Sequence, residues 1–426
     1  MTTKALRGLA LSTISLLLVL GLAAALPTSA AFASDDDAAS ALSAATTPTK
    51  AQQKAFKKAS ADFSLELFQR CVAAKGSNSN VTIAPMSVMN ALAVTANGAD
   101  GKTAEQMRKV LGDGASMARI NKNMRWYNGK LKSYSKAKLR NANAIWYHND
   151  GSLKINKKFV SKAKKYYKAK VSGADFGSSA TVNEINSWVA QKTNDMIKRV
   201  ISNLQPSDRI AIVNAQYFDA KWRVPFEADR TQTKIFKNAK GQKHKVKMMY
   251  STENKYIEGT NVVGFVKPYA KGYSYVALLP KKGMSLKRYV KTLDGDTFRK
   301  LVSKTTDATV HVAMPKYSVT YTNEGMDAQL KAMGIKSAFK RNADFSKMGT
   351  DTAGNLYIGS VVHKTKVDVD EEGTKAAAVT AIVMRASAMP SPDVKNVTLN
   401  RPFIYAIVDN STKLPVFIGT VNDIKK

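Results

Sequence analysis

The sequence holds a single cysteine, Cys71, among its 426 residues, so no disulfide can form within the chain. Stability must therefore come from packing, and an apolar fraction of 44% is ample for a large core. We expect Cys71 itself to be a small buried hydrophobic residue. Histidine is also scarce, and its four copies are scattered without the spacing of metal ligands. We therefore expect neither a metal site nor a cofactor.

The sequence also lacks the short motifs that mark common enzyme classes. It contains no Gly-x-Ser-x-Gly elbow and no phosphate-binding loop. Two Ser-x-x-Lys segments, at 133–136 and 161–164, match the spacing of penicillin-binding enzymes, but the Lys-Thr-Gly and Ser-Asp-Asn partners of that site are missing. In a chain this rich in lysine such spacing arises by chance, so the sequence does not predict an enzyme.

Long apolar runs are absent except near the N-terminus. Basic residues precede an apolar stretch at 9–26, and a small-residue Ala-Phe-Ala segment ends at Ala33, which is the order of a secretory signal peptide. We predict a signal peptide over residues 1–33 and a secreted, extracellular protein with no membrane attachment after cleavage. An uncleaved membrane anchor is the alternative, although serine and threonine interrupt the short run. Residues 34–50 are small and polar, which favours a flexible leader.

Acidic residues are few relative to basic ones: 32 Asp and Glu stand against 66 Lys and Arg, a formal net charge of +34. Such a surface binds polyanions in a salt-dependent way. The excess is greatest in two stretches, 119–140 and 153–170, where apolar residues at helical spacing predict two basic helices. Their charge could serve solubility alone, or it could bind a glycan, a cell-wall polymer or a nucleic acid. The candidate polyanion-binding residues are Arg119, Lys122, Arg125, Lys130 and Lys132.

From residue 51 to residue 426 no linker, composition break or internal repeat interrupts the chain, which predicts one domain. Its first half is mostly helical: amphipathic patterns predict helices at its start, over 103–112 behind a threonine cap, and over 181–201. Its second half consists of short runs rich in β-branched and aromatic residues, separated by turn residues. This order predicts an α+β fold with large, mostly antiparallel sheets.

Five segments carry a resemblance to a known family. They are "NVTIAPMSVMNALAVTANGADGKTAEQM" (80–107), "VNAQYFDAKWRVPF" (213–226), "MPKYSVTYTNEGMDAQLKAMGIKSAF" (314–339), "ADFSKM" (343–348) and "VTLNRPFIYAIVDNSTKLPVFIGTVND" (397–423). In this order they are similar to segments of the serpins, the serine-protease-inhibitor superfamily, and the resemblance covers about 51 to 424. It implies the serpin fold, in which helices pack on three mostly antiparallel β-sheets, with an exposed reactive-centre loop at about 373–396. It also implies a protease inhibitor whose partner is a serine protease; we expect a secreted, bacterial, monomeric member.

The segment "VDVDEEGTKAAAVTAIVM" (367–384) resembles the family's strand, hinge and start of the reactive loop. In serpins the loop enters the main sheet as an extra strand once a protease cuts it, and the attached acyl-enzyme is dragged along and distorted. The residues that would face inward after insertion are small or apolar here, as an inhibitory member requires. The hinge residues are Glu371, Gly373, Thr374, Ala376, Ala377 and Ala378.

Two further groups of side chains are carried over from the family. The shutter, beneath the opening of the main sheet, comprises Ser87, Asn214 and His363. The breach, at the top of that sheet, comprises Trp222, Lys316 and Glu371, and the resemblance implies that Lys316 and Glu371 form an ion pair. Ala84 stands where the family usually has a second shutter serine, so one hydroxyl is lost.

The resemblance also implies which bond the target protease cuts. Counting from Glu371 by the family's usual spacing places the bond between Ser387 and Ala388, where small residues suit an elastase-like or subtilisin-like protease. The alternative bond, Arg385–Ala386, would suit a trypsin-like protease. The loop is longer than usual around residues 391–396, so the count stays open. A non-inhibitory serpin-fold protein that binds polyanions through its basic helices is the other alternative, and the clean hinge argues against it.

Overall fold

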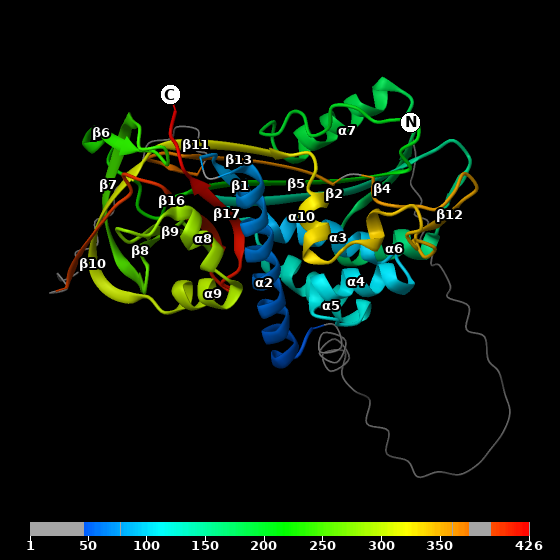
Figure 1. Ribbon diagram of the computed structural model, residues 1–426, viewed down its shortest axis with the longest axis horizontal. Helices are drawn as coiled ribbons and strands as arrows, with labels where there is room; N and C mark the ends of the chain where they lie inside the picture. Colours follow the sequence, from blue (N-terminus) through cyan, green and yellow to red (C-terminus); the bar gives the residue numbers. More distant parts are fainter. Residues whose placement is uncertain (1–46, 77, 360, 375–392, 426) are drawn as a thin grey trace, which may run out of the picture. The chain divides into compact units, whose positions relative to one another are not determined.

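The computed structural model describes residues 47–76, 78–359, 361–374 and 393–425, which form one unit (Figure 1). The predicted signal peptide, most of the predicted leader and most of the predicted reactive-centre loop lie outside the described residues. The first helix begins at Lys50, where Thr49 forms a capping box with Gln52. None of the helices in the described part is both long and apolar enough to cross a bilayer.

The first half of the described chain carries most of the helices. The α-helices are α2 (Lys50–Lys75), α3 (Pro85–Ala96), α4 (Gly101–Gly112), α5 (Met117–Lys130), α6 (Lys157–Tyr167), α7 (Ser179–Lys192), α8 (Leu286–Thr292), α9 (Gly295–Ser303) and α10 (Asp327–Met333), with 3-10 turns η1 (Ala228–Arg230) and η2 (Ser337–Phe339). Helix α3 is buried along its whole length. Cys71, on α2, is buried and free, as predicted.

A six-stranded sheet runs through the centre of the unit. Its strands, in spatial order, are β11 (Tyr317–Asn323), β13 (Val361–Val369), β14 (Gly373–Thr374), β5 (Ile210–Lys221), β2 (Ala137–His148) and β4 (Lys170–Ala174). Neighbours are antiparallel, except that β2 runs parallel to β4 and that β13 also pairs directly and in parallel with β5.

A nine-stranded sheet holds most of the remaining strands. Its path is β1 (Val81–Ile83), β17 (Pro415–Val421), β16 (Phe403–Asp409), β9 (Tyr273–Pro280), β8 (Val262–Pro268), β7 (Lys243–Gly259), β10 (Thr306–Pro315) and β15 (Val394–Thr398), with β6 (Gln232–Lys237) also pairing with β7. A two-stranded sheet joins β3 (Leu153–Ile155) to β12 (Gly349–Asp351). Three mostly antiparallel sheets with packed helices confirm the predicted α+β class.

Helices cover the two faces of the six-stranded sheet (Figure 1). On one face, Ile185 and Val189 of α7 share a core with Val213 and Ala215 of β5. Because side chains alternate along a strand, Asn214 and its neighbours at even positions face the opposite side, towards α3. The sheet is therefore buried on both faces where β5 and β13 meet.

Two of the predicted helices end earlier than predicted. In the stretch 119–140, the helix stops at Lys130, and residues from Ala137 on form β2. Buried and exposed side chains alternate over residues 137–140, and pairing with β5 overrides the helical spacing. The helix predicted over 181–201 stops at Lys192, because Asn194 and Asp195 adopt left-handed backbone conformations with φ of 53° and 60°.

The other two corrections concern helix starts. In the stretch 153–170, residues 153–155 pair with β12, and the helix begins only after Asn156, whose side chain accepts a hydrogen bond from Lys158 N–H. The predicted threonine cap at Thr103 is also wrong: α4 begins at Gly101, behind Asp100.

Candidate functional site

The six-stranded sheet is forked where β13 and β5 meet. At one end the two strands pair directly, residues 361–364 with residues 212–215. At the other end β14 lies between them: Thr374 pairs with Val369 of β13 and with Ala220 of β5, and Gly373 pairs with Lys221. We call this arrangement the fork. Two residues, Gly373 and Thr374, therefore lie between β13 and β5 at one end, and at the other end β13 and β5 pair directly with each other.

Both residues of β14 are fitted to the fork. A Cβ atom on Gly373 would lie 2.1 Å from the carbonyl oxygen of Ala220, so no larger residue fits without moving β5. Thr374 is 1% exposed, and its hydroxyl lies 2.5 Å from that of Tyr269, which is itself buried. The first hinge threonine therefore faces inward. The hinge residues Ala376, Ala377 and Ala378, and both candidate cleavage sites (Ser387–Ala388 and Arg385–Ala386), lie outside the described residues.

A tight turn at residues 370–373, the hinge turn, connects β13 to β14. The carboxylate of Asp370 accepts hydrogen bonds from the N–H groups of Glu372 and Gly373. Glu371 Oε2 lies 2.6 Å from Lys316 Nζ, and Glu371 Oε1 accepts a hydrogen bond from Thr231. The structure thus brings the sequence-predicted pair Lys316 and Glu371 together.

The ionisation of the two neighbouring carboxyls is shifted in opposite directions. Burial raises the pKa of Asp370 above its usual value, against the two backbone N–H groups that favour the charged form. Burial acts in the same sense on Glu371, but hydrogen bonds and the charge of Lys316 outweigh it and hold the pKa of Glu371 below its usual value.

Trp222, at the end of β5, binds the hinge turn from the side. Its indole Nε1–H donates to the carbonyl of Asp370 and its backbone N–H to that of Glu372, both at 2.9 Å. The ring is 2% exposed and stacks on Tyr269 with the centroids 4.5 Å apart. Trp222 and Lys316 thus both contact the hinge turn, which contains Glu371.

The shutter side chains lie at the closed end of the fork, against the start of α3. Ser87 donates a hydrogen bond of 2.8 Å to Asn214 Oδ1, and Asn214 Nδ2 donates to Asn143 of β2 at 2.6 Å. His363 pairs with Asn214 across the direct β13–β5 contact, and its Nε2 accepts the N–H of Ala84 at 3.1 Å. Asn143 was missed from the sequence, because nothing near it marks a link to residues about 70 positions away.

One ring nitrogen of His363 has no hydrogen-bond partner among the described residues. Its Nδ1 is buried and makes no hydrogen bond to the described residues. Because Nε2 accepts a hydrogen bond, the neutral ring carries its proton on Nδ1, which is left as an unsatisfied donor. Burial lowers the pKa of His363 to about 4. The side chain of Ala84 offers no hydroxyl to this site.

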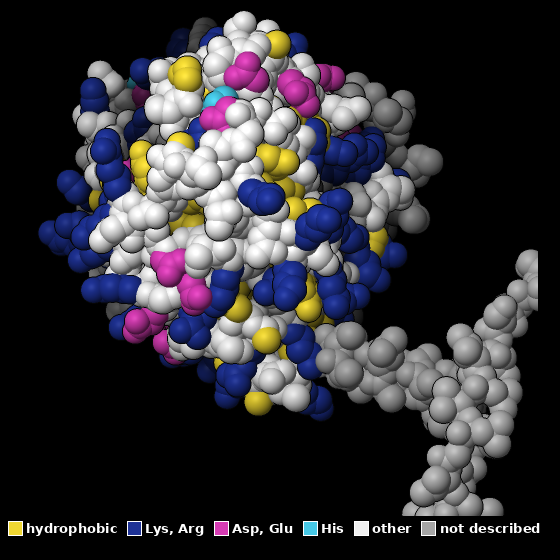
Figure 2. All heavy atoms as spheres, turned by 90° about the vertical axis from the view of Figure 1, so that its right-hand side faces the viewer, with side chains coloured by type: hydrophobic (Ala, Val, Ile, Leu, Met, Phe, Trp, Pro, Cys, Tyr) yellow, Lys and Arg dark blue, Asp and Glu magenta, His cyan; other side chains and the backbone are white. Residues whose placement is uncertain are grey.

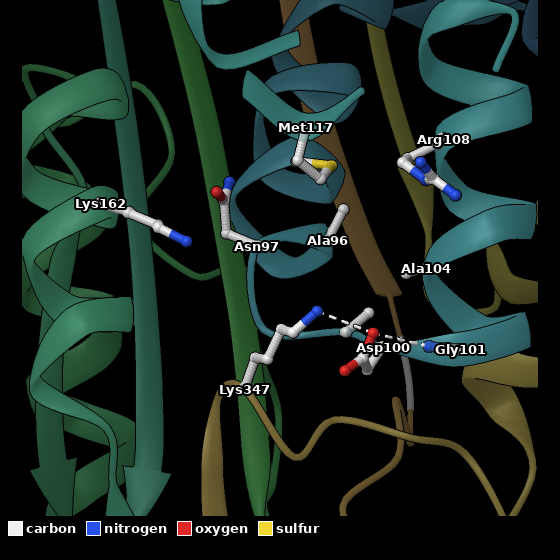
Figure 3. A pocket seen from close by; sticks show the side chains of 10 residues that line it. Ala96, Asn97, Asp100, Gly101, Ala104, Arg108, Met117, Lys162 and Lys347 are labelled. Atoms are coloured by element: carbon white, nitrogen blue, oxygen red, sulfur yellow. Dashed lines mark hydrogen bonds and ion pairs between the residues drawn. The ribbon is translucent and has the colours of Figure 1, made fainter. Parts of the chain in front are cut away.

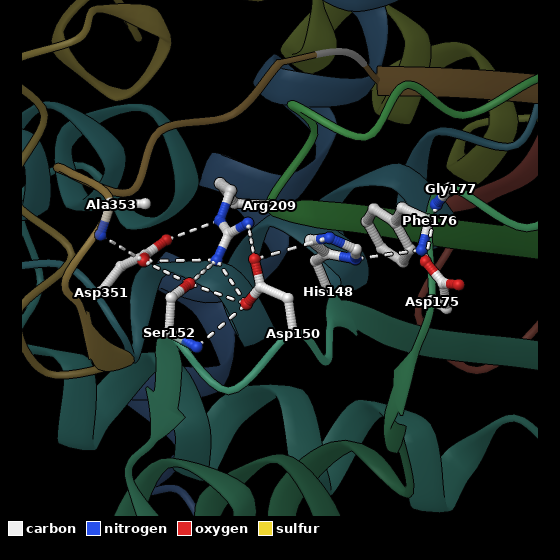
Figure 4. Close-up of polar contacts among 9 residues, drawn as sticks. All are labelled: His148, Asp150, Ser152, Asp175, Phe176, Gly177, Arg209, Asp351 and Ala353. Atoms are coloured by element: carbon white, nitrogen blue, oxygen red, sulfur yellow. Dashed lines mark hydrogen bonds and ion pairs between the residues drawn. The ribbon is translucent and has the colours of Figure 1, made fainter.

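A second polar cluster, the base cluster, lies at the other end of the same sheet (Figure 4). Arg209 binds Asp351 through Nε at 2.6 Å and Asp150 through Nη1 at 2.8 Å, and it also contacts the Ser152 hydroxyl. These bonds hold the pKa of Asp150 well below its usual value. His148 accepts the N–H of Phe176 at 3.0 Å. No local sequence pattern marks this cluster, because its members come from four separate segments.

The candidate polyanion-binding residues lie on α5 and just after it. Arg119, Arg125, Lys130 and Lys132 are exposed and Lys122 is half-buried. Near the start of α5 lies a cavity of about 370 Å³ into which Arg108, Lys162 and Lys347 project, with Lys347 paired to Asp100 at 2.7 Å (Figure 3). Figure 2 shows basic side chains spread widely over one face of the protein, with acidic ones in small groups. Among the described residues no cluster could hold a metal ion.

Comparisons with known proteins agree with this geometry. A family model described as "Serpin (serine protease inhibitor)" matches residues 58–424. An uncharacterized serpin-like protein of Thermococcus kodakarensis is 33% identical, with 86% of this chain and 85% of the relative covered. A leukocyte elastase inhibitor of Xenopus tropicalis is 31% identical, with 84% and 96% covered. These organisms leave the expected bacterial source untested.

Solved structures show the same fold. The thermophilic serpin Tengpin in its native state is 44% identical and superposes with a TM-score of 0.82, covering 87% of this chain and 94% of that one. Tengpin in its latent state gives a TM-score of 0.77 at 42% identity, covering 87% and 98%. The described residues are therefore more similar to the native form of that protein than to its latent form.

Proposed function

The chain belongs to the serpin family, and on that premise we propose that it is a secreted, single-use inhibitor of elastase-like or subtilisin-like serine proteases. The target attacks the reactive-centre loop and forms an acyl-enzyme with it. The loop then enters the six-stranded sheet at the fork and carries the attached protease with it, and the distorted protease cannot complete hydrolysis. The protein acts as a mechanical trap and not as a catalyst.

The fork is the observation that supports this proposal. β14 is antiparallel to both neighbours: Gly373 pairs with Lys221 and Thr374 with Ala220 of β5, and Thr374 pairs with Val369 of β13. Each further residue of such a strand would therefore pair with the preceding residue of β5 and of β13. If both registers continued, Thr380 would lie opposite Asn214 on one side and opposite His363 on the other. Because both registers lead to the same shutter pair, a strand that extends β14 would fit the fork without a bulge.

The closed state of the fork leaves buried polar atoms unsatisfied. His363 Nδ1 and Gln216 Oε1 have no partner among the described residues, and such a group costs about 1–3 kcal/mol. In the continued register Thr380 would bring a hydroxyl beside His363. Insertion would also replace the direct contact of β13 and β5 by two full ladders of hydrogen bonds, which releases free energy.

The proposed cleavage site is the bond predicted from the sequence, Ser387–Ala388, with Arg385–Ala386 as the alternative for a trypsin-like target. To test both function and bond, the mature protein is mixed with elastase-, subtilisin-, chymotrypsin- and trypsin-like proteases and analysed on denaturing gels and by intact mass. We expect a covalent complex and a released C-terminal peptide that starts at Ala388. A peptide that starts at Ala386 would move the target to trypsin-like enzymes.

Cleavage without any complex would contradict the inhibitory function if the cleaved protein also gains no thermal stability. A large gain would show that the loop still inserts, so that either the panel lacks the right protease or insertion is slower than hydrolysis of the acyl-enzyme. The melting midpoint of the cleaved protein therefore tests loop insertion separately from the choice of protease.

Polyanion binding is a second candidate function. Arg119, Lys122 and Arg125 recur every third residue on α5 and share one side of the helix. The protein should bind an immobilised sulfated or phosphate polymer at low salt and elute as the salt concentration rises. The variant with alanine at Arg119, Lys122 and Arg125 should elute at clearly lower salt than a control with alanine at Lys157, Lys158 and Lys165 of α6. If both variants eluted at the same salt concentration, the binding would depend on the net charge of the protein and not on a site on α5.

A further inference from the structure

A fully buried lysine lies directly behind the breach. Lys267, near the end of β8, is 1% exposed. Its ammonium group lies 2.7 Å from Glu253 Oε1 of β7 and donates a hydrogen bond of 3.0 Å to the carbonyl of Val224. It also lies 4.2 Å from the ring centroid of Phe226 and 5.6 Å from that of Trp222. The ammonium group therefore contacts an anion, a carbonyl dipole and two aromatic rings.

Stability alone does not account for this lysine. A buried ion pair gives up the hydration of two charges, and apolar side chains of similar volume are often equally stable or more stable in its place. The rings of Phe226 and Trp222 lie beside Lys267, and a methionine there, with a leucine in place of Glu253, would pack against them. What an apolar side chain could not do is bind the Val224 carbonyl, so the lysine is best explained by that contact.

Val224 lies at the middle of a segment that holds the hinge turn. Two residues before it, Trp222 N–H donates to the carbonyl of Glu372, and two residues after it, Phe226 N–H donates to the carbonyl of Glu371, both at 2.9 Å. Between these two anchors the segment has little apolar contact, since the Val224 side chain is 52% exposed and Arg223 is also exposed. Its ties to the sheet are the Lys267 ammonium and the bond from Arg223 N–H to the carbonyl of Pro268.

We propose that Lys267 is a positioning residue that fixes the hinge turn through the segment 222–226. This inference rests on the inhibitory function proposed above and adds a determinant of its efficiency. The hinge turn connects β13 to β14 in the fork, and the same turn must connect them when the strand is fully inserted, so it is the fixed point about which the loop moves. When the hinge turn is held in one position, the first inserted residues can pair with β13 and β5 in only one register.

The consequence is kinetic. After acylation, insertion of the loop competes with hydrolysis of the acyl-enzyme, and slower insertion releases active protease with a cleaved inhibitor. Loss of the Lys267 contact should therefore convert part of the inhibitor into substrate. The number of inhibitor molecules consumed per protease inactivated measures this partition directly.

The test variant removes both charges, Lys267→Met with Glu253→Leu, because removing the lysine alone would leave Glu253 buried without a partner. The matched control is Lys281→Met with Glu258→Leu, which removes an exposed ion pair between the ends of β9 and β7. We expect the test variant to consume about threefold or more inhibitor per protease, with a melting midpoint no lower than that of the wild type. The control should behave as the wild type.

Hydrogen exchange of the Trp222 and Phe226 amides provides a second readout that needs no protease. We expect faster exchange at both amides in the test variant only. Unchanged exchange and unchanged consumption would overturn the proposal, and so would a large fall in melting midpoint with unchanged consumption, which would assign the pair to stability. If the wild type traps no protease, the inhibitory function fails, and exchange at these amides alone decides the role of Lys267.

Discussion

Asn214 and His363 lie opposite each other where β5 and β13 pair directly, and the start of α3 holds them both, Asn214 through Ser87 and His363 through the N–H of Ala84. A strand that enters the fork must separate this pair. The contacts of α3 therefore oppose opening of the sheet, and a change that weakens either contact should ease opening.

Protonation of His363 should weaken one of these contacts. Burial lowers the pKa of His363 to about 4, below its ordinary value of 6.5, so the folded protein holds the ring neutral while the unfolded chain takes up a proton. The stabilisation is complete above about pH 6.5 and is lost as the pH falls through 4, a total of ~3 kcal/mol for a shift of this size. Melting midpoints of the uncleaved protein should fall across this window.

The matched controls for this pH dependence are two glutamine variants. His363→Gln should melt with a smaller dependence on pH between 6.5 and 4, whereas His311→Gln, which changes an exposed ring on β10, should keep the dependence of the wild type. Identical slopes in all three proteins would assign the effect to other groups.

A charge at Thr374 should convert the inhibitor into a substrate. Thr374 is already buried against Tyr269 in the uncleaved protein, so Thr374→Arg should displace β14 from the fork, and loop insertion would then have to bury an unpaired guanidinium. A rise of only ~1.4 kcal/mol in the insertion barrier slows that step tenfold. We expect cleavage without covalent complex on denaturing gels. Thr398→Arg, at an exposed position on β15, should trap protease normally, and complex formation by both variants would contradict the inward placement.

The Lys316–Glu371 ion pair should restrain the hinge turn. Glu371→Gln should lower the stability of the uncleaved protein by about 1 kcal/mol, because the pair is partly exposed on the lysine side. Glu371→Lys should cost more, since it places two positive charges together. Combining Glu371→Lys with Lys316→Glu should recover much of the loss in chemical denaturation, and no recovery would show that the geometry of the hinge turn matters more than the charges.

Arg209 should stabilise the base of the six-stranded sheet. Its side chain is 12% exposed and that of Asp351 is 2% exposed, so Arg209→Gln would leave a buried carboxylate without its cation. We expect a loss of roughly 2–4 kcal/mol in free energy of unfolding, somewhat below the cost for a fully buried pair. Arg288→Gln, on the exposed side of α8, should change stability little. An equal loss in free energy of unfolding for both variants would contradict a stabilising role of the base cluster.

Much of the fold could be predicted from the sequence by itself. Local pattern located α2, β5 and the strands of the second half, because each carries its period over several residues. The five ordered segments identified the family, and through it the hinge turn and the placement of Lys316 beside Glu371.

Other features were decided only by the tertiary structure. Lysine-rich stretches predict continuous helices, yet pairing of residues 137–147 with β5 made the last four residues of the stretch 119–140 the start of a strand, because a backbone ladder with a distant strand outweighs a weak helical spacing. The contacts of Asn143, Lys267 and Arg209 likewise depend on partners far away in the chain, and no local pattern encodes them. The extent to which β14 enters the sheet is a balance between direct β13–β5 pairing and insertion, and only the folded structure sets that balance.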